Sequence, residues 1–272
     1  MKGIDVSKDK YDLKNIKLVA LDLDGTLLDD HLDISNTTKE TISNLVDRGI
    51  NVALVSGRPY KAVEFVREKL EIDIPVVAYN GGMVIIHGKN KIFSMKIPLR
   101  EALKVIRYGE ERDLYVKVYI DDILYIKEPD EKSIIFSKSR NINYKVVGKL
   151  SDNIKEDVNM IIIYYNEDIN GLIDEELKDV DATITTSTSN SIDVIPKGIS
   201  KEKGIRMIAE NLNIKRENIL AIGNSLNDIE MLKYAGIGIA MKNSDISLLR
   251  EWNNIAEYTN NEDGVYHIIN QI

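Results

Sequence analysis

Short apolar runs alternate with amphipathic stretches over residues 16–82, and no other feature of the chain constrains the fold as strongly. Three of these runs are typical of buried strands: IKLVALD (16–22), NVALVS (51–56) and PVVAYN (75–80). The stretches between them carry apolar residues at helical spacing, and a strand–helix–strand order requires parallel strands joined by right-handed crossovers. The same order resumes near residue 200, with further predicted strands at 219–223 and 235–240. We therefore predict an α/β fold with a parallel sheet flanked by helices.

The middle of the chain has a different pattern. Segments 83–95 and 115–126 are typical of hairpins, which imply antiparallel pairing. Further predicted elements are helices at 98–112, 131–140 and 168–179 and strands at 159–165, 183–187 and 191–195. This mixture indicates a second, mixed α/β domain inserted into the parallel one, with crossings near Gly81 and Gly82 and near residues 190–193. The predicted division is 1–82 with 192–272 for the core and 83–191 for the insert.

Composition excludes several classes of partner. The net charge of −8 and the pI near 5.1 give a field that repels polyanions, which argues against nucleic acid and anionic membranes. A chain without cysteine has no disulfide and no thiolate metal site. The first fifteen residues are too polar for a signal peptide, and no window approaches the roughly 20 apolar residues of a membrane span. We therefore expect a cytoplasmic protein.

Two aspartates, Asp22 and Asp24, follow the first predicted strand in LVALDLDGTLL. Open α/β sheets place their ligand sites at the carboxyl ends of strands. Residues two apart in extended chain point the same way, so both carboxylates can face one site, and Gly25 lets the chain turn away. The alternative is an acidic turn capped by Thr26. A calcium-binding EF-hand loop fits worse, because apolar residues stand where further oxygen ligands should lie.

Ser56 is the last residue of the second predicted strand, and Ser56 and Gly57 open the helix that follows. The Ser56 hydroxyl could donate to an anion beside the exposed amides of the helix N-terminus, whereas an ordinary N-cap is the plainer interpretation.

Lys201 lies in the first turn of a predicted helix, where a cation opposes the helix dipole. An anionic ligand or the aspartates would compensate for this charge, although a solvated surface lysine is the commoner explanation. Lys197 and Lys203 are alternatives for the same role.

The run AIGNSLNDIEML (221–232) places Asn224, Asn227 and Asp228 in a tight turn before a helix. Polar residues are normal in such turns. The coincidence gives the pattern weight, because four strand-end loops of one parallel sheet together supply carboxylates, a hydroxyl and a lysine.

These residues resemble the haloacid dehalogenase-like (HAD) superfamily, and specifically its Cof-type sugar-phosphatase-like branch. The matching motifs, in the same order, are DLDGTL, the SGR that ends at Arg58, PKG-x-x-K, GN-x-x-NDIEML and the late EDGV. Asn80 with Gly81 and Gly82 is similar to the Asn-Gly step at which that branch enters its α/β cap. The resemblance implies a Rossmann-like core and an inserted cap that determines substrate specificity.

The resemblance also implies a two-step phosphoryl transfer. Asp22 would attack phosphorus, and water would later cleave the aspartyl phosphate. Asp24 would act as the acid and then as the base. Ser56, Gly57 and Lys201 would bind the transferring phosphoryl group. The supporting residues would be Gly25, Thr26, Arg58, Asn80 and Asn227.

A Mg²⁺ site is implied among Asp22, the backbone carbonyl of Asp24 and the side chains of Asn224 and Asp228. Asn224 is a departure, since the family usually has aspartate there. The amide oxygen can still coordinate a hard cation, but the site loses one negative charge, so we expect weaker Mg²⁺ binding and a raised Mg²⁺ requirement.

The sequence thus predicts a Mg²⁺-dependent phosphatase that acts on a small phosphorylated metabolite, such as a sugar phosphate or a cofactor phosphate. A phosphomutase and a catalytically weak phospholigand-binding protein are the alternatives. The tyrosines of the insert could stack on a ring of the substrate, although alternating tyrosines more often line one face of a sheet. The natural substrate and the oligomeric state are not readable from the sequence.

Overall fold

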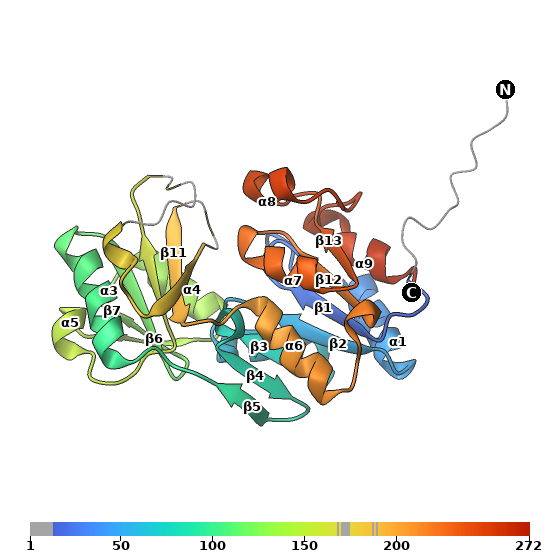
Figure 1. Ribbon diagram of the computed structural model, residues 1–272, viewed down its shortest axis with the longest axis horizontal. Helices are drawn as coiled ribbons and strands as arrows, with labels where there is room; N and C mark the ends of the chain where they lie inside the picture. Colours follow the sequence, from blue (N-terminus) through green and yellow to red (C-terminus); the bar gives the residue numbers. More distant parts are fainter. Residues whose placement is uncertain (1–12, 168, 170–174, 187, 189) are drawn as a thin grey trace.

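The computed structural model describes residues 13–272, apart from residues 168, 170–174, 187 and 189. The described residues form two sheets, which lie in separate lobes (Figure 1). The first sheet has the order β13-β12-β1-β2-β3-β4-β5. Its strands are β1 (Leu18–Asp22), β2 (Asn51–Val55), β3 (Val76–Ala78), β4 (Met83–Ile86), β5 (Asn90–Ser94), β12 (Ile219–Gly223) and β13 (Ile237–Ala240).

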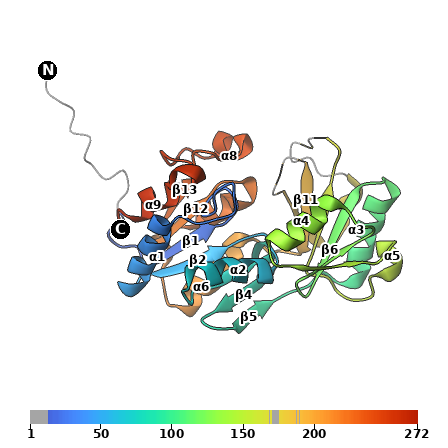
Figure 2. The same cartoon turned by 180° about the vertical axis from the view of Figure 1, so that it is seen from behind.

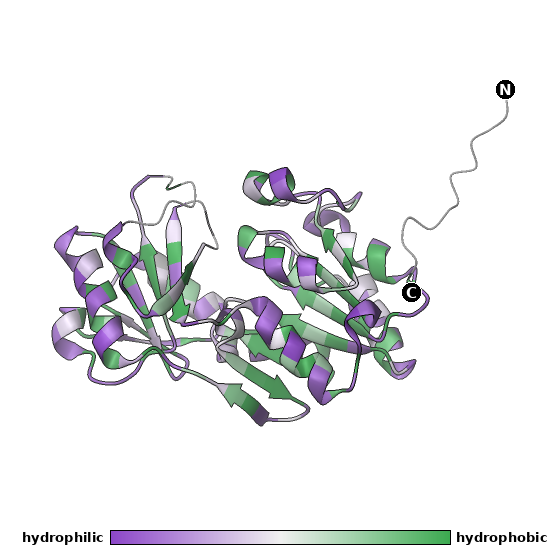
Figure 3. Ribbon diagram, in the orientation of Figure 1, coloured by the Kyte–Doolittle hydropathy of each residue, from purple (hydrophilic) through white to green (hydrophobic). Residues whose placement is uncertain are grey.

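Helices cover both faces of this sheet, which is why its central strands are apolar at nearly every position, Asn51 and Asp22 at strand ends being the polar ones in β2 and β1. Val19 and Leu21 of β1 pack in one cluster with α1 (Asn36–Asp47), α2 (Tyr60–Leu70) and α9 (Gly264–Ile269). Leu18 and Ala20 pack on the opposite face with α6 (Lys201–Asn211), α7 (Ile229–Tyr234) and α8 (Ile246–Glu251). The face of the sheet with α6 and α7 is toward the viewer in Figure 1, and the face with α1 and α2 is toward the viewer in Figure 2. Figure 3 shows the apolar strands between the helices. The predicted fold class is confirmed.

The second sheet has the order β10-β11-β9-β6-β7-β8. Its strands are β6 (Tyr115–Ile120), β7 (Ile123–Ile126), β8 (Asn143–Val146), β9 (Met160–Tyr164), β10 (Ala182–Thr185) and β11 (Ser191–Pro196), and its helices are α3 (Leu99–Glu111), α4 (Glu131–Ser139) and α5 (Leu150–Asn153). We call this sheet with its three helices the cap. α3 packs on one face of the sheet, and the opposite face, with α4, turns toward the core lobe. Half of the predicted helix at 168–179 lies outside the described residues, which show one 3₁₀ turn there, Glu175–Leu177.

The division between the two sheets differs from the predicted boundaries. The hairpin β4–β5 extends the core sheet, since β4 pairs with β3, whereas β11 pairs with β9 and β10 of the cap. The chain therefore crosses after Ser94 and after Pro196, not near Gly81 or residues 190–193. Alternating apolar residues predict a hairpin but not the sheet that it joins. The packing in the core lobe is consistent with its pairing, since Val84 of β4 is fully buried in one cluster with residues of α6.

No helix among the described ranges is both long enough and apolar enough to span a bilayer.

Candidate active site

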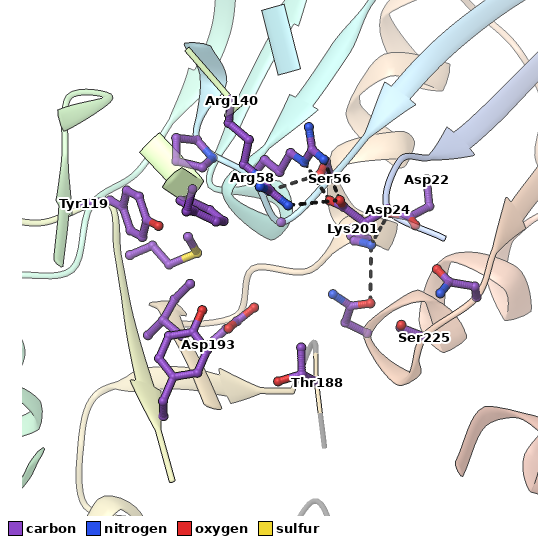
Figure 4. A pocket seen from close by; sticks show the side chains of 18 residues that line it. Asp22, Asp24, Ser56, Arg58, Tyr119, Arg140, Thr188, Asp193, Lys201 and Ser225 are labelled. Carbon is purple, nitrogen blue, oxygen red and sulfur yellow. Dashed lines mark hydrogen bonds and ion pairs between the residues drawn. The ribbon is translucent and has the colours of Figure 1, made fainter. Parts of the chain in front are cut away.

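Several of the predicted site residues lie together at the carboxyl edge of the core sheet (Figure 4). Asp22 is the last residue of β1, Ser56 follows β2, and Asn224 follows β12. β1 pairs in parallel with both β2 and β12, so the three loops open on the same side. Lys201 is the first residue of α6, which follows the last cap strand, β11, in the chain, and its side chain reaches the same place.

Lys201 is buried between two carboxylates. Its Nζ donates to Asp22 Oδ1 (2.7 Å) and to Asp228 Oδ1 (2.6 Å), and all three side chains are at most 6% exposed. Burial alone would lower the pKa of Lys201, but the charges of Asp22 and Asp228 raise it, so the ammonium persists. The alternatives point elsewhere: Lys197 pairs with an exposed aspartate, and Lys203 Nζ donates to a backbone carbonyl.

One ammonium does not balance two buried carboxylates. Burial and the charge of Asp228 raise the pKa of Asp22 to about 7, against the lowering effect of Lys201. A further positive charge near Asp22 would stabilise its ionised form. The site is therefore electrostatically suited to a cation.

The oxygens around Asn224 fit a magnesium ion. The Asn224 side-chain atom that faces the site lies 3.1 Å from Asp22 Oδ2 and 2.8 Å from the carbonyl oxygen of Asp24. With Mg–O distances of about 2.0–2.1 Å, neighbouring ligands of an octahedral ion are separated by about 3 Å. In the other amide orientation, the nitrogen would donate to both oxygens and to Thr26 Oγ1 (3.1 Å), so this amide serves the site with or without an ion.

Asp228 does not point freely at this position. Its Oδ1 accepts from Lys201, and its Oδ2 accepts from the backbone amides of Asn224 (2.9 Å) and Ser225 (3.0 Å). Among the described residues, no group of three or more His, Cys, Asp or Glu side chains could hold a metal ion. The candidate donor set is instead mixed: one carboxylate, one amide and one backbone carbonyl. The sequence-based ligand set included Asp228 directly, whereas here its two oxygens are engaged by Lys201 and backbone amides.

Asp24 is held by arginines. Arg58 Nε donates to Asp24 Oδ2 (2.7 Å), Arg58 Nη2 donates to Oδ1 (2.5 Å), and Arg140 Nη2 lies 3.7 Å from Oδ1. Burial alone would raise the pKa of Asp24, but the hydrogen bonds and charge of Arg58, followed by the charge of Arg140, lower it overall. Asp24 is thus poised in its ionised form. Arg58 belongs to a predicted motif, whereas no sequence signal marked Arg140 at the end of its helix.

Ser56 lies at the floor of the site but does not cap α2. The N-cap of that helix is Pro59, and the Ser56 hydroxyl accepts from the Arg58 amide (3.1 Å), which leaves its proton for another acceptor. Gly57 is required by space, since a Cβ there would lie 3.0 Å from both amide atoms of Asn80. A Cβ at Gly25, where φ is +73°, would lie 2.5 Å from Asn224 Nδ2.

A chain of hydrogen bonds joins the core site to the cap. Lys201 donates to Asn227 Oδ1 (3.3 Å), Asn227 Nδ2 donates to Asn80 Oδ1 (3.2 Å), and Asn80 Nδ2 donates to Asp193 Oδ2 (3.1 Å). Asn80 holds this place in a left-handed conformation, with φ 52°. Asp193 belongs to β11 of the cap and was not among the predicted site residues.

A cavity of about 260 Å³ lies between the two lobes and connects these groups. The core lines it with Asp22, Asp24, Ser56, Gly57, Arg58, Pro59, Lys201, Asn224, Ser225 and Asn227. The cap lines it mainly with apolar and aromatic side chains. Tyr119 and Tyr164 are among the tyrosines of the insert that the sequence suggested could stack on a ring. The other cap residues that line the cavity were not predicted, because the sequence of a single strand does not show which of its faces meets a cavity.

The fold and the site define a two-lobed α/β protein with a capped parallel core, in which aspartates and a buried lysine meet at the ends of parallel strands. The chain belongs to the haloacid dehalogenase-like hydrolase family, whose model matches residues 19–269. This confirms the family predicted from the sequence.

Named relatives cover nearly the whole chain. The 5-amino-6-(5-phospho-D-ribitylamino)uracil phosphatase YitU of Bacillus subtilis is 32% identical over 93% of this chain and 96% of its own length. Protein TM0651 from Thermotoga maritima is 28% identical, with a TM-score of 0.77 over 94% of this chain and 97% of that one. The HAD subclass IIB sugar phosphatase BT4131 is 25% identical, with a TM-score of 0.78 over 94% and 98% of the two chains.

Proposed function

We propose that this chain is a Mg²⁺-dependent phosphatase that hydrolyses a small phosphorylated metabolite through an aspartyl phosphate on Asp22. One observation carries the proposal: Asp22 ends β1 in a buried site, with Lys201 Nζ at 2.7 Å from Oδ1 and an Asn224 side-chain amide atom at 3.1 Å from Oδ2 and 2.8 Å from the Asp24 carbonyl oxygen. In this arrangement, Oδ1 of Asp22 accepts a hydrogen bond from Lys201, and Oδ2 faces the proposed cation site. When bound there, Mg²⁺ would offset the repulsion between this carboxylate and a phosphate.

The remaining groups would bind and orient the phosphoryl group. Lys201 lines the cavity and would stabilise the charge that spreads over the phosphoryl oxygens in the transition state. The Ser56 hydroxyl, whose oxygen already accepts from the Arg58 amide, would donate its proton to another of these oxygens. Both groups are fixed before substrate binds, which reduces the reorganisation needed during the reaction.

Asp24 would transfer protons to and from the reacting oxygens. It lines the same cavity as Asp22, and half of its side chain (48%) is accessible there. In the first step it would protonate the leaving oxygen, and in the second it would take a proton from the attacking water. The Arg58 clamp favours the ionised form, so it supports the second role and must relax for the first.

The substrate that these data favour is the one for which the Bacillus relative is named, 5-amino-6-(5-phospho-D-ribitylamino)uracil. Support comes from the 32% identity over nearly the whole chain. It comes also from the cavity, whose core side (the floor) carries charged groups and whose cap side (the roof) is mainly apolar and aromatic.

Phosphate release from p-nitrophenyl phosphate in Mg²⁺ tests the reaction type. We expect steady turnover that Asp22→Asn abolishes and that the matched surface variant Asp47→Asn leaves unchanged. Transfer of phosphate to an added sugar without net release would identify a mutase. Tight binding of phosphorylated ligands with no release from any substrate would identify a binding protein and overturn the proposal.

A further inference from the structure

The roof of the cavity is one face of the cap sheet. β6 and β9 pair so that Tyr119 lies opposite Met160, and β9 pairs with β11 so that Ile162 lies opposite Asp193. Side chains alternate between the faces of a sheet, and these four line the cavity together with Tyr164. The result is a mainly apolar surface with a hydroxyl at one position and a carboxylate at another.

α4 adds a flat cationic edge to this roof. The guanidinium of Arg140 lies 4.2 Å from the ring centre of Phe136, and both residues line the cavity. Stacking fixes the guanidinium plane and leaves its N–H groups directed along its edge. Arg140 is mostly buried, with 18% of its side chain exposed, and the 3.7 Å approach to Asp24 is too long for a hydrogen bond. Nη1 of Arg140 donates to Ser139 Oγ (3.1 Å), so Nε and Nη2 are the donors that it can offer to a ligand beside Asp24.

Tyr119 presents a second donor. Its ring is fully buried, and its hydroxyl has no hydrogen-bond partner within the described part of the chain. Figure 4 shows this hydroxyl pointing into the cavity, on the opposite side from Asp22. A buried hydroxyl without a partner is costly, so natural proteins rarely keep one without a reason. The neighbouring Met160 is unbranched and flexible, which would let a ligand atom reach this hydroxyl.

The acceptor on this surface is Asp193. Its Oδ2 accepts from Asn80, and its carboxylate lines the cavity. Asp193 lies on β11 opposite Ile162 of β9, and β6 with Tyr119 pairs with the other edge of β9. Donors (Arg140 and Tyr119) and an acceptor (Asp193) thus border an apolar surface that includes Phe136 and Tyr164. A ligand that matches all of these has two apolar faces and a rim with both carbonyl and N–H groups. A free sugar, which has hydroxyls on all sides, would leave the aromatic side chains facing polar groups.

We propose that this roof is a leaving-group subsite that recognises a flat heterocycle with carbonyl and N–H groups, with Arg140 and Tyr119 as its specificity-determining donors. The inference rests on the proposed phosphatase function and deepens it, because it assigns to named cap residues the recognition of the ring that the substrate's alcohol carries. Recognition of the ring therefore comes from the cap, whereas the phosphate is bound by the core.

Two substrates that differ only in the ring test the proposal. 5-Amino-6-(5-phospho-D-ribitylamino)uracil carries the heterocycle, and ribitol 5-phosphate has the phosphate and the chain without it. We expect the native enzyme to prefer the ring-bearing substrate by at least about tenfold in kcat/KM. Tyr119→Phe, which removes one oxygen, should reduce kcat/KM for that substrate by about tenfold, the effect of one lost hydrogen bond, and leave ribitol 5-phosphate unaffected.

Arg140→Lys provides the second arm, because it keeps a positive charge near Asp24 but loses the planar fork and its stacking. It should reduce the preference for the ring by about tenfold or more, while activity on ribitol 5-phosphate persists. Arg107→Lys, on an exposed position of α3, is the matched control and should leave both activities unchanged. Equal losses on both substrates would show that Arg140 serves the core site and would overturn its role in ring recognition.

Binding separates this inference from the proposed chemistry. In Asp22→Asn protein, dissociation constants measured by calorimetry should show the same preference for the ring-bearing compound, lost in the Tyr119→Phe double variant. If p-nitrophenyl phosphate is hydrolysed but neither turnover nor binding distinguishes the two compounds, the subsite is wrong and the phosphatase stands. If nothing is hydrolysed but the ring is still preferred in binding, the subsite stands and the proposed reaction fails.

Discussion

The floor and the roof of the cavity are built in different ways. Every polar group of the floor lies within a few residues of a strand end, and short motifs such as DLDGTL and GNSLND mark it. The roof is assembled from β6, β9, β11 and α4, and its side chains stand singly within otherwise ordinary strands and a helix. A site that binds a constant group can thus be concentrated in loops, whereas a surface that recognises a variable group is spread over a sheet face.

The largest expected effect belongs to the floor and follows removal of Lys201. Lys201→Met would leave Asp22 and Asp228 buried without their counter-charge, and breaking a buried ion pair costs about 3–5 kcal/mol of stability. We expect kcat to fall by about 10²–10³, as for the loss of one transition-state donor. Denaturant unfolding with and without Mg²⁺ measures the first effect, and we expect Mg²⁺ to restore part of it. If Lys201→Met stays fully active and stable, the core side of the cavity does not carry the larger share of function and stability that we assign to it.

Arg58→Met tests the clamp on Asp24. Since the hydrogen bonds and charge of Arg58 lower the pKa of Asp24, its removal should raise that pKa. The first chemical step needs Asp24 protonated, so the high-pH limb of the kcat/KM profile should move to higher pH. We expect the maximum of the profile to fall by about a hundredfold, because the carboxylate also loses its orientation. An unchanged pH profile would show that Asp24 does not protonate the leaving group, and Arg48→Met is the surface control.

Asn224→Asp examines the departure from the family motif. A carboxylate 3.1 Å from Asp22 Oδ2 would add one negative charge to the cation site. Such a charge contributes about 1–4 kcal/mol to attraction of a cation, so we expect at least roughly tenfold tighter Mg²⁺ binding and a lower Mg²⁺ requirement. Without Mg²⁺ the variant should be less stable than the native protein, because two carboxylates then face each other. Thermal unfolding across a Mg²⁺ titration measures both effects, and an identical titration in the two proteins would contradict this account of Asn224.

The smallest effect concerns the cap, where Lys117 is buried among three rings. Its Nζ lies 4.4 Å from the ring centre of Phe136 and 5.0 Å from that of Tyr164, and burial lowers its pKa to about 8. Between about pH 8 and the ordinary value of 10.5, the unfolded chain binds more protons, so the free energy of unfolding should rise with pH. Lys117→Met removes this dependence, and at pH 7 it should stabilise the protein by about 1–3 kcal/mol, reduced by the lost cation–π contacts.

Denaturant unfolding of both proteins between pH 7 and 10.5 measures the difference directly. Tyrosine ionisation at the upper end occurs in both and cancels in the comparison. If the difference in free energy of unfolding between Lys117→Met and the native protein does not become smaller as the pH rises, the burial of a charged Lys117 does not destabilise the fold.

Local patterns in the amino-acid sequence were enough to predict the parallel core and most of the polar groups on the core side of the cavity. Periodicity located the strands, and the residues that follow β1, β2 and β12 are polar for reasons that local structure explains, so their convergence could be inferred from parallel pairing alone. The choice of Lys201 over Lys197 and Lys203 was open in the sequence, and the buried contacts of Lys201 with Asp22 and Asp228 single it out.

Three features could not be predicted from local patterns: the sheet that the hairpin β4–β5 joins, the face of the cap sheet that meets the cavity, and the 3.7 Å approach of Arg140 to Asp24. These features depend on contacts between residues that are far apart in the chain. Local patterns of apolar and polar residues are the same for a strand in either sheet and on either face, because the energy that selects between them comes from packing against distant partners.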